Sequence, residues 1–309
     1  MALDHDTAGA VGDQLPEDLQ KLFRERMAQA DEPVPGPVEP KLPPLPEVRG
    51  VLFDVYGTLV QSAAGEISLH TEDGRARPFY QLAEALPATV SFDRVEALAA
   101  RYYEKIAEVH AARRALGVRH PEVDIITVWH SLAEEFPELL GGGQEGQFPQ
   151  ARWLALRFEL EANPVAPMPA AGELLRDLRR HGQLLGIVSN AQFYTPLLFP
   201  LLFGGTPEEL GFAFSVWSYR EGEAKPSEKL YRNAADWFAK AYNVKPEELL
   251  MIGNDMRNDV APAAAVGMKT ALFAGDRRSL RLRSDDPEYR DTQPDIVLTN
   301  LRQLHEVLP

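Results

Sequence analysis

Short, mostly apolar runs divide the second half of the chain into regular segments, and one such run stands earlier. The first is Val51-Leu52-Phe53, and four others occupy residues 184–188, 249–252, 270–273 and 294–298. Each run is only a few residues long, and polar or small residues follow it. Runs of this kind are typical of strands that are buried on both faces of a parallel sheet.

Helical patterns lie between these runs. Residues 170–181 and 227–242 carry apolar side chains at a spacing of three and four, and Gly182 is placed to cap the first helix. Alternating strands and helices predict an α/β fold with a doubly wound parallel sheet. In such a sheet, ligands bind at the carboxyl ends of the strands.

One long segment interrupts the alternation. Residues 79–86, 91–116, 124–136 and 150–161 show helical patterns, and no apolar run of the strand type separates them. We therefore expect residues 65–164 to form a mainly helical cap domain inserted after the first strand. Residues 48–64 and 165–309 would then form the catalytic core, and the cap would move relative to it and exclude water.

Residues 1–47 have a different composition. A short amphipathic helix is expected near residues 15–28, and seven prolines follow between residues 33 and 46. Prolines at this density favour an extended, polyproline-like chain. We interpret residues 1–47 as a proline-rich extension, either a linker or a strap on the surface, with a partner-binding motif as the alternative.

Composition limits the possible partners. Among 309 residues, 45% are hydrophobic, 25% are charged and none is cysteine, so disulfides, thiolate metal sites and cysteine nucleophiles are excluded. The net charge of −14 argues against nucleic acid as a partner. The acidic beginning does not resemble a signal peptide, and no apolar stretch is long enough to cross a membrane. We expect a cytoplasmic protein that acts on a small molecule.

Polar residues form four motifs at the ends of predicted core elements, and these motifs stand in a specific order along the chain. They are Asp54-Val55-Tyr56-Gly57-Thr58 after the first strand, Ser189-Asn190 after the second, Lys225-Pro226 at the start of a helix, and Gly253-Asn254-Asp255-Met256-Arg257-Asn258-Asp259 after the next strand. Over residues 48–309 this order resembles the haloacid dehalogenase (HAD)-like hydrolase superfamily. One such motif would be weak evidence, whereas four in order at strand ends are specific.

The resemblance implies a Rossmann-like core and a covalent mechanism. Asp54 would be the nucleophile that forms an aspartyl intermediate, with Ser189 and Lys225 as further catalytic residues. Lys225 would hold the nucleophile and an anionic substrate together. The substrate would contact Tyr56, Gly57, Thr58 and Asn190.

A magnesium site is also implied. Its ligands would come from Asp54, Tyr56 through its carbonyl, Asn254, Asp255 and Asp259, because hard oxygen donors suit Mg²⁺. Asn254 aligns with the position where the family usually has its first acid. We therefore expect Asp255 to be the nearest direct ligand, and Asp255→Asn to weaken metal dependence more than Asp259→Asn.

Two departures from the family pattern point in opposite directions. Most phosphatases of the family have a catalytic aspartate where this chain has Tyr56, and tyrosine is the residue of the metal-independent 2-haloacid dehalogenases. Those dehalogenases lack the acidic pair that this chain keeps at Asp255 and Asp259, and acids that converge without a cation would repel one another. We expect a magnesium-dependent phosphatase of a small anionic metabolite. The alternatives are a 2-haloacid dehalogenase-type hydrolase without metal and a weakly active or non-catalytic anion-binding protein.

Overall fold

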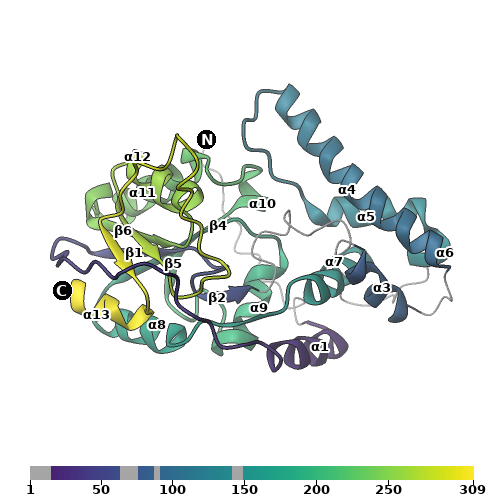
Figure 1. Cartoon of the computed structure of the whole chain (residues 1–309), viewed down its shortest axis with the longest axis horizontal. Helices are drawn as coiled ribbons and strands as arrows, with labels where there is room; N and C mark the ends of the chain where they lie inside the picture. Colours follow the sequence, from purple (N-terminus) through teal and green to yellow (C-terminus); the bar gives the residue numbers. More distant parts are fainter. Residues whose placement is uncertain (1–14, 63–75, 87–90, 141–148) are drawn as a thin grey trace.

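A six-stranded parallel sheet organises the larger lobe of the molecule (Figure 1). The computed structural model describes residues 15–62, 76–86, 91–140 and 149–309. The strands follow the order β5-β4-β1-β6-β7-β8, and every neighbouring pair is parallel. Their bounds are β1 Gly50–Phe53, β4 Leu184–Ser189, β5 Phe212–Trp217, β6 Leu249–Gly253, β7 Lys269–Phe273 and β8 Ile296–Leu298. The predicted α/β class with a parallel sheet is confirmed.

Strand β5 is absent from the sequence prediction, and its position explains why. It is an edge strand that pairs only with β4, so several of its side chains are only partly buried. Such a position tolerates a polar residue, and Ser215 interrupts the apolar run there. The pattern of a strand buried on both faces does not apply to such an edge.

Helices cover both faces of the sheet because successive strand side chains point to opposite sides. Val51 and Phe53 join the larger hydrophobic cluster, whereas Leu52 joins a second cluster with helix α11. The helices of this lobe are α8 Ala171–Arg180, α9 Tyr194–Phe203, α10 Ser218–Glu221, α11 Glu228–Tyr242, α12 Ala261–Ala265 and α13 Leu304–Val307.

A smaller helical lobe, the cap, lies beside the core (Figure 1). It contains α3 Arg77–Glu84, α4 Phe92–Ala115, α5 Ile125–Glu135, α6 Pro137–Leu140 and α7 Gln150–Ala162. The antiparallel strands β2 Val60–Ser62 and β3 Val165–Pro167 connect it to the core. Residues 65–75, 87–90 and 141–148 of the expected cap lie outside the described residues. A cluster of aromatic rings fills the cap, with Phe79 and Phe158 4.6 Å apart between centroids.

The extended N-terminal segment lies along the edge of the core. Lys41 and Val297 form an antiparallel bridge, with N–O distances of 3.0 and 2.9 Å, and the Leu45 amide donates to Val307 at 2.7 Å. Gly36 donates to the carbonyl of Ala274 at 2.7 Å. These main-chain bonds place the proline-rich segment beside β7 and β8.

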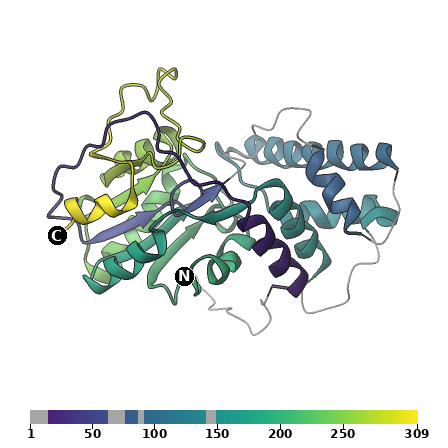
Figure 2. The same ribbon diagram turned by 60° about the horizontal axis from the view of Figure 1, so that its bottom comes forward.

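Helix α1 Glu17–Met27 precedes the proline-rich segment of residues 33–46, which we call the strap. The helix packs against the cap helix α7 (Figure 2). Leu19 and Phe23 are 0% and 1% exposed, respectively, although they belong to a segment outside both lobes. Arg26 Nε donates to Glu161 of α7 at 2.9 Å, and the side chain of that acid is 1% exposed. The N-terminal segment therefore contacts the core through the strap and the cap through α1.

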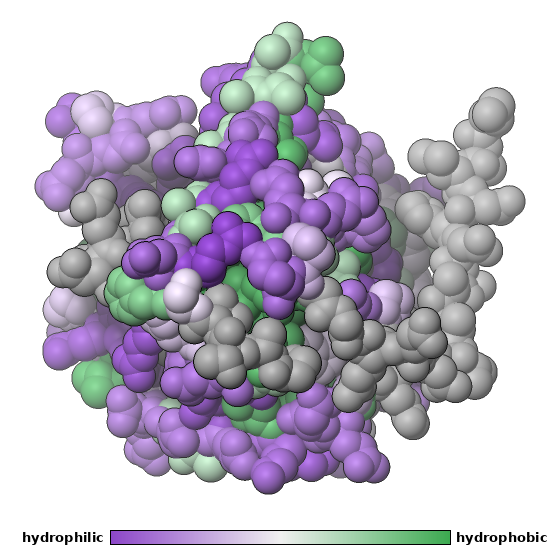
Figure 3. Space-filling view, turned by 90° about the vertical axis from the view of Figure 1, so that its right-hand side faces the viewer, coloured by the Kyte–Doolittle hydropathy of each residue, from purple (hydrophilic) through white to green (hydrophobic). Residues whose placement is uncertain are grey.

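The cap face of the molecule is mainly hydrophilic, with small separated apolar areas in the part that is not grey (Figure 3). That surface agrees with the net charge of −14. None of the helices among the described residues combines the length and the apolar character that crossing a membrane would require.

The α1 contact predicts a stability effect. Phe23→Ala removes a fully buried ring, and such a truncation costs about 3–5 kcal/mol in a well-packed core. We expect a loss of about 3 kcal/mol in the free energy of unfolding measured in urea. Amide hydrogen exchange in α7 should become faster in the same variant.

Lys21→Ala is the matched control on α1, because the Lys21 side chain is 79% exposed and makes only an exposed pair with Glu25 at 3.9 Å. Its stability should remain within about 0.5 kcal/mol of the parent protein. Equal behaviour of the two variants would contradict the docking of α1.

Candidate active site

The position of Asp54, the predicted nucleophile, is set by a tight turn after β1. The Asp54 amide donates to Ile252 of β6 at 2.9 Å, which keeps the backbone within the sheet for one more residue. The amides of Thr58, Leu59 and Val60 all then donate to the carbonyl of Val55. This turn directs the Asp54 side chain above the carboxyl ends of the strands.

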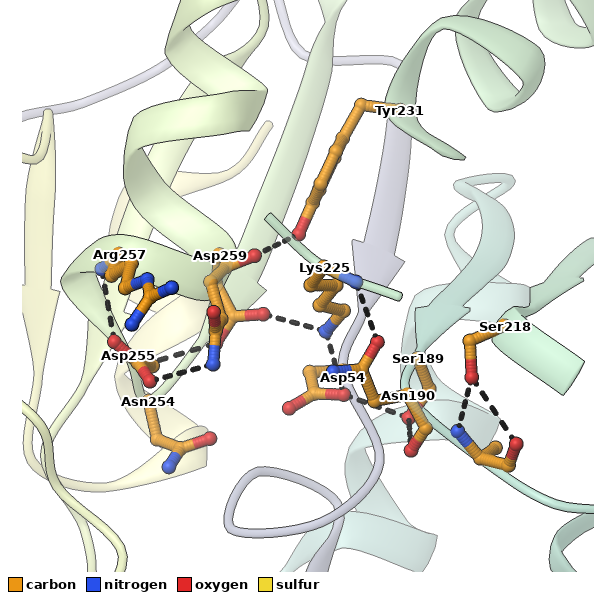
Figure 4. Close-up of polar contacts among 12 residues, drawn as sticks. Asp54, Ser189, Asn190, Ser218, Lys225, Tyr231, Asn254, Asp255, Arg257 and Asp259 are labelled. Atoms are coloured by element: carbon orange, nitrogen blue, oxygen red, sulfur yellow. Dashed lines mark hydrogen bonds and ion pairs between the residues drawn. The ribbon is translucent and has the colours of Figure 1, made fainter. Parts of the chain in front are cut away.

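The two carboxylate oxygens of Asp54 are in different environments (Figure 4). Oδ1 accepts a hydrogen bond from Ser189 Oγ at 2.8 Å and lies 2.8 Å from Lys225 Nζ. Oδ2 has no hydrogen-bond partner among the described residues, and it points toward the side of Asn254. One oxygen is therefore held in place, and the other is free to react.

Lys225 joins two acids that lie on different elements. Its Nζ is 2.8 Å from Asp54 and 2.6 Å from Asp259 Oδ1, and all three side chains are largely buried. Burial lowers the pKa of Lys225, but the charges of Asp259 and Asp54 outweigh it, and the net pKa is raised. Lys225 therefore carries a positive charge at neutral pH. Burial also raises the pKa of Asp259, although Lys225 opposes this effect.

The charges of this buried group do not cancel. With both acids ionised, Asp54 and Asp259 contribute −2 and Lys225 contributes +1, so the net charge is −1. A buried net charge is costly unless something compensates it. The group therefore favours an additional cation, and more strongly so when an anionic substrate approaches.

The motif at residues 253–259 presents its two acids differently. Asp259 faces Lys225, and its other oxygen accepts from the Asp255 amide at 3.0 Å. Gly253 is needed below it, because a Cβ at that position would lie 2.2 Å from Asp259 Cγ. Asp255 instead pairs with Arg283, with Nε 3.0 Å from Oδ1 and a terminal nitrogen 2.6 Å from Oδ2.

No three histidine, cysteine, aspartate or glutamate side chains converge as a metal-binding group within the described ranges. Nevertheless, the donor chemistry at the free face of Asp54 suits a hard cation. Asn254 uses its Nδ2 to donate to the Ser279 carbonyl at 2.5 Å, which leaves its oxygen on the side that faces Asp54 (Figure 4). Asp54, Asn254 and Asp259 together offer the oxygen ligands that Mg²⁺ prefers.

The other predicted site residues lie around this centre. Gly57 has φ +82°, and a Cβ there would meet the Asn254 amide at 2.7 Å, so only glycine fits the turn. Thr58 Oγ1 is buried and has no hydrogen-bond partner in the described part of the chain, an unusual state for a hydroxyl. The Asn190 side chain accepts from the Lys225 amide at 2.7 Å and so positions that lysine. Their contacts with a substrate remain predictions.

The Tyr56 side chain bonds to a residue outside the charged group. Its hydroxyl lies 2.9 Å from Thr195 Oγ1 at the start of α9. Burial raises the pKa of the Tyr56 phenol, so this group stays neutral. The side chain therefore helps to shape the border between core and cap.

One contact between cap and core beside the site was not predicted from the sequence. Glu122, in the loop between α4 and α5, accepts from Ser218 Oγ at 2.6 Å, and the Ala224 amide donates to the carbonyl of His120 at 2.8 Å. Burial raises the pKa of Glu122, while its bond from Ser218 acts in the opposite direction. The cap thus contacts the core at Ala224, the residue before Lys225. Isolated polar residues in a loop gave no signal for this contact.

The sequence matches a known protein family and named relatives. The family model of haloacid dehalogenase-like hydrolases matches residues 48–267. A glyceraldehyde 3-phosphate phosphatase of Pyrococcus furiosus is 31% identical over 66% of this chain and 86% of its own length. A phosphoserine phosphatase of Thermus thermophilus is 29% identical over 74% of this chain and 79% of its own length.

The fold is also similar to that of a solved protein. The crystal structure of a 2-haloacid dehalogenase from Pseudomonas syringae has a TM-score of 0.50 and 21% identity, and the match covers 84% of this chain and 97% of that one. The family model spans most of the chain and includes all four motifs. This protein belongs to the haloacid dehalogenase-like hydrolase family.

Proposed function

We propose that the protein is a magnesium-dependent phosphatase that hydrolyses a small phosphorylated metabolite through an aspartyl phosphate on Asp54. The observation that carries this proposal is the asymmetry of the Asp54 carboxylate. Ser189 and Lys225 hold Oδ1, while Oδ2 has no partner among the described residues. A carboxylate held in this way needs little reorganisation before it attacks.

The reaction has two balanced steps. Asp54 Oδ2 attacks the phosphorus, the bond from phosphorus to the ester oxygen breaks, and that oxygen takes a proton from water. A second water then attacks the phosphorus of the aspartyl phosphate, which releases phosphate and restores the carboxylate. Lys225 supplies positive charge beside the transferred group, and Ser189 supplies a hydroxyl donor.

Charge favours a metal in this reaction. With both acids ionised the buried group has a net charge of −1, and a phosphate dianion would bring the total to −3. Magnesium would reduce this total to −1, because it screens the repulsion between nucleophile and substrate. Asp54, Asn254, Asp259 and the Tyr56 carbonyl are the groups that would hold it.

The names of the two relatives support the substrate class. Both relatives are phosphatases, and both printed substrates are small phosphorylated metabolites. The cap loop that contacts Ser218 would close over a substrate of this size. A macromolecular substrate would need that loop to remain open.

A metal-free dehalogenase is the second candidate, and one observation favours it. Lys225 already bridges Asp54 and Asp259, so the acids are held together without a metal ion. Tyr56 also occupies the position that is tyrosine in the 2-haloacid dehalogenases. A 2-haloacid carries a single carboxylate charge, so it would demand less positive charge than a phosphate.

Asp54→Asn tests the nucleophile. The change removes the reactive charge without adding bulk, so kcat should fall by at least about 10⁴-fold while the fold persists. Binding of the unreacted phosphomonoester should persist or become tighter, because one repulsive charge is lost. Single-turnover kinetics measure the loss of turnover, and circular dichroism checks that the fold persists.

Asp236→Asn on α11 is the control for this substitution, since Asp236 is exposed and lies outside the charged group. It should retain normal turnover. Substantial residual activity in a folded Asp54→Asn protein would remove Asp54 from the mechanism.

Magnesium removal separates the two candidate reactions. Chelator should abolish phosphomonoester hydrolysis, and added magnesium should restore it. Magnesium at 100 times its Kd should also stabilise the folded protein by about 2.7 kcal/mol. Halide release from a 2-haloacid that persists in chelator would instead identify the dehalogenase.

A further inference from the structure

The loop after β7 follows the motif at residues 253–259 closely. The Arg281 amide donates to Asn254 at 2.9 Å, and the Met256 amide donates to Arg281 at 3.0 Å. The carbonyl of Ser279 in the same loop accepts from the Asn254 side chain at 2.5 Å. This loop therefore forms a second layer behind the residues that face Asp54.

Arg283 ends this layer with a two-pronged ion pair. Its Nε and one terminal nitrogen bind the two oxygens of Asp255 at 3.0 and 2.6 Å. The Asp255 side chain is only 6% exposed, and that of Arg283 is 23% exposed, so solvent screens the pair poorly. Arg283 has φ +55°, in the left-handed region that non-glycine residues seldom adopt. An uncommon backbone conformation thus accompanies this pair.

Neighbouring residues use the remaining hydrogen-bond acceptor sites of the Asp255 carboxylate. Oδ1 also accepts from the Arg257 amide at 2.9 Å, and Oδ2 accepts from Asn258 Nδ2 at 2.9 Å. Each oxygen therefore accepts two hydrogen bonds, which matches the acceptor capacity of a carboxylate. In this arrangement Asp255 caps the helical turn that presents Asp259 and has no free lone pair for a cation.

Main-chain bonds link the capped residue to the reactive group. The Asp255 amide donates to Asp259 Oδ2 at 3.0 Å, and the Asp259 amide donates to the Asp255 carbonyl at 2.9 Å. Asp259 Oδ1 in turn lies 2.6 Å from Lys225 Nζ. A change in the position of Asp255 would therefore reach Asp259 and Lys225.

We propose that Arg283 is a positioning residue that holds Asp255 as a helix cap and outside the cation site. This inference rests on the proposed magnesium-dependent phosphatase. Asp259 is then the acid of this motif that serves the cation, which reverses the order expected from the sequence. The charges of Asp255 and Arg283 cancel, so the buried group keeps a net charge of −1 rather than −2.

The inference predicts that Asp255→Asn suppresses the defect caused by Arg283→Gln. Arg283→Gln releases a charged acid beside the site, so kcat on a phosphomonoester should fall about tenfold while KM stays within twofold, and magnesium should bind more tightly. Asp255→Asn should weaken magnesium binding only a few-fold, because asparagine still caps the turn. The double variant should recover most of kcat and near-normal magnesium affinity.

The measurements are isothermal titration with magnesium alone and steady-state kinetics on the full-length protein. Arg283→Lys keeps the charge without the fork, so its kcat should lie between the parent and Arg283→Gln. Arg277→Gln is the matched control, because this arginine in the same loop is exposed and its hydrogen bond to the strap comes from its main-chain amide, which the substitution keeps. It should behave as the parent protein does.

Three results would overturn the inference. One is a double variant as poor as Arg283→Gln, another is loss of magnesium binding in Asp255→Asn alone, and the third is unfolding of both Arg283 variants. Parent protein that hydrolyses no phosphomonoester would contradict the proposed function instead. Magnesium titration of the parent protein, Arg283→Gln, Asp255→Asn and the double variant would still decide the role of Arg283. Parent protein that binds no magnesium would overturn both the inference and the proposed function.

Discussion

A buried ammonium group between two carboxylates is the interaction on which the site depends. Lys225 reaches Asp54 after β1 and Asp259 after β6, and those strands are neighbours in the sheet. Without Lys225 the two acids would repel each other, and one would take up a proton. Lys225 opposes this effect, and one oxygen of Asp54 remains without a partner among the described residues. In the proposed mechanism, the reactivity of Asp54 and the ionic contacts at this end of the sheet thus have the same source.

The rest of the molecule supports this arrangement at increasing distance. Asn190 holds the backbone of Lys225, and the loop ending at Arg283 holds the turn that carries Asp259. Farther away, the cap loop closes beside Ala224, and α1 contacts the opposite part of the cap. The N-terminal segment spans both lobes, because its helix α1 packs against α7 of the cap and the strap that follows lies along the core edge (Figure 2).

Local sequence patterns predicted what depends on local physics. Buried strands such as β1 and β6 and amphipathic helices such as α11 have periodic signals, and the motif residues follow the strand ends. The edge strand β5 lacks full burial and so lacked the signal. Arg283 could not be found in the same way, because it reaches Asp255 from 28 residues away through a loop of irregular conformation. Asp255 looked like a ligand for the same reason, since its partner leaves no mark on the surrounding sequence.

The most direct measurement is a crystal structure of the protein with magnesium and beryllium fluoride, which imitates a phosphoryl group on a carboxylate. The account predicts beryllium bonded to Asp54 Oδ2 and magnesium held by Asp54, Asn254 and Asp259, with Asp255 still paired to Arg283. Beryllium fluoride bound elsewhere, or a magnesium ion held by Asp255 with Arg283 displaced, would contradict it.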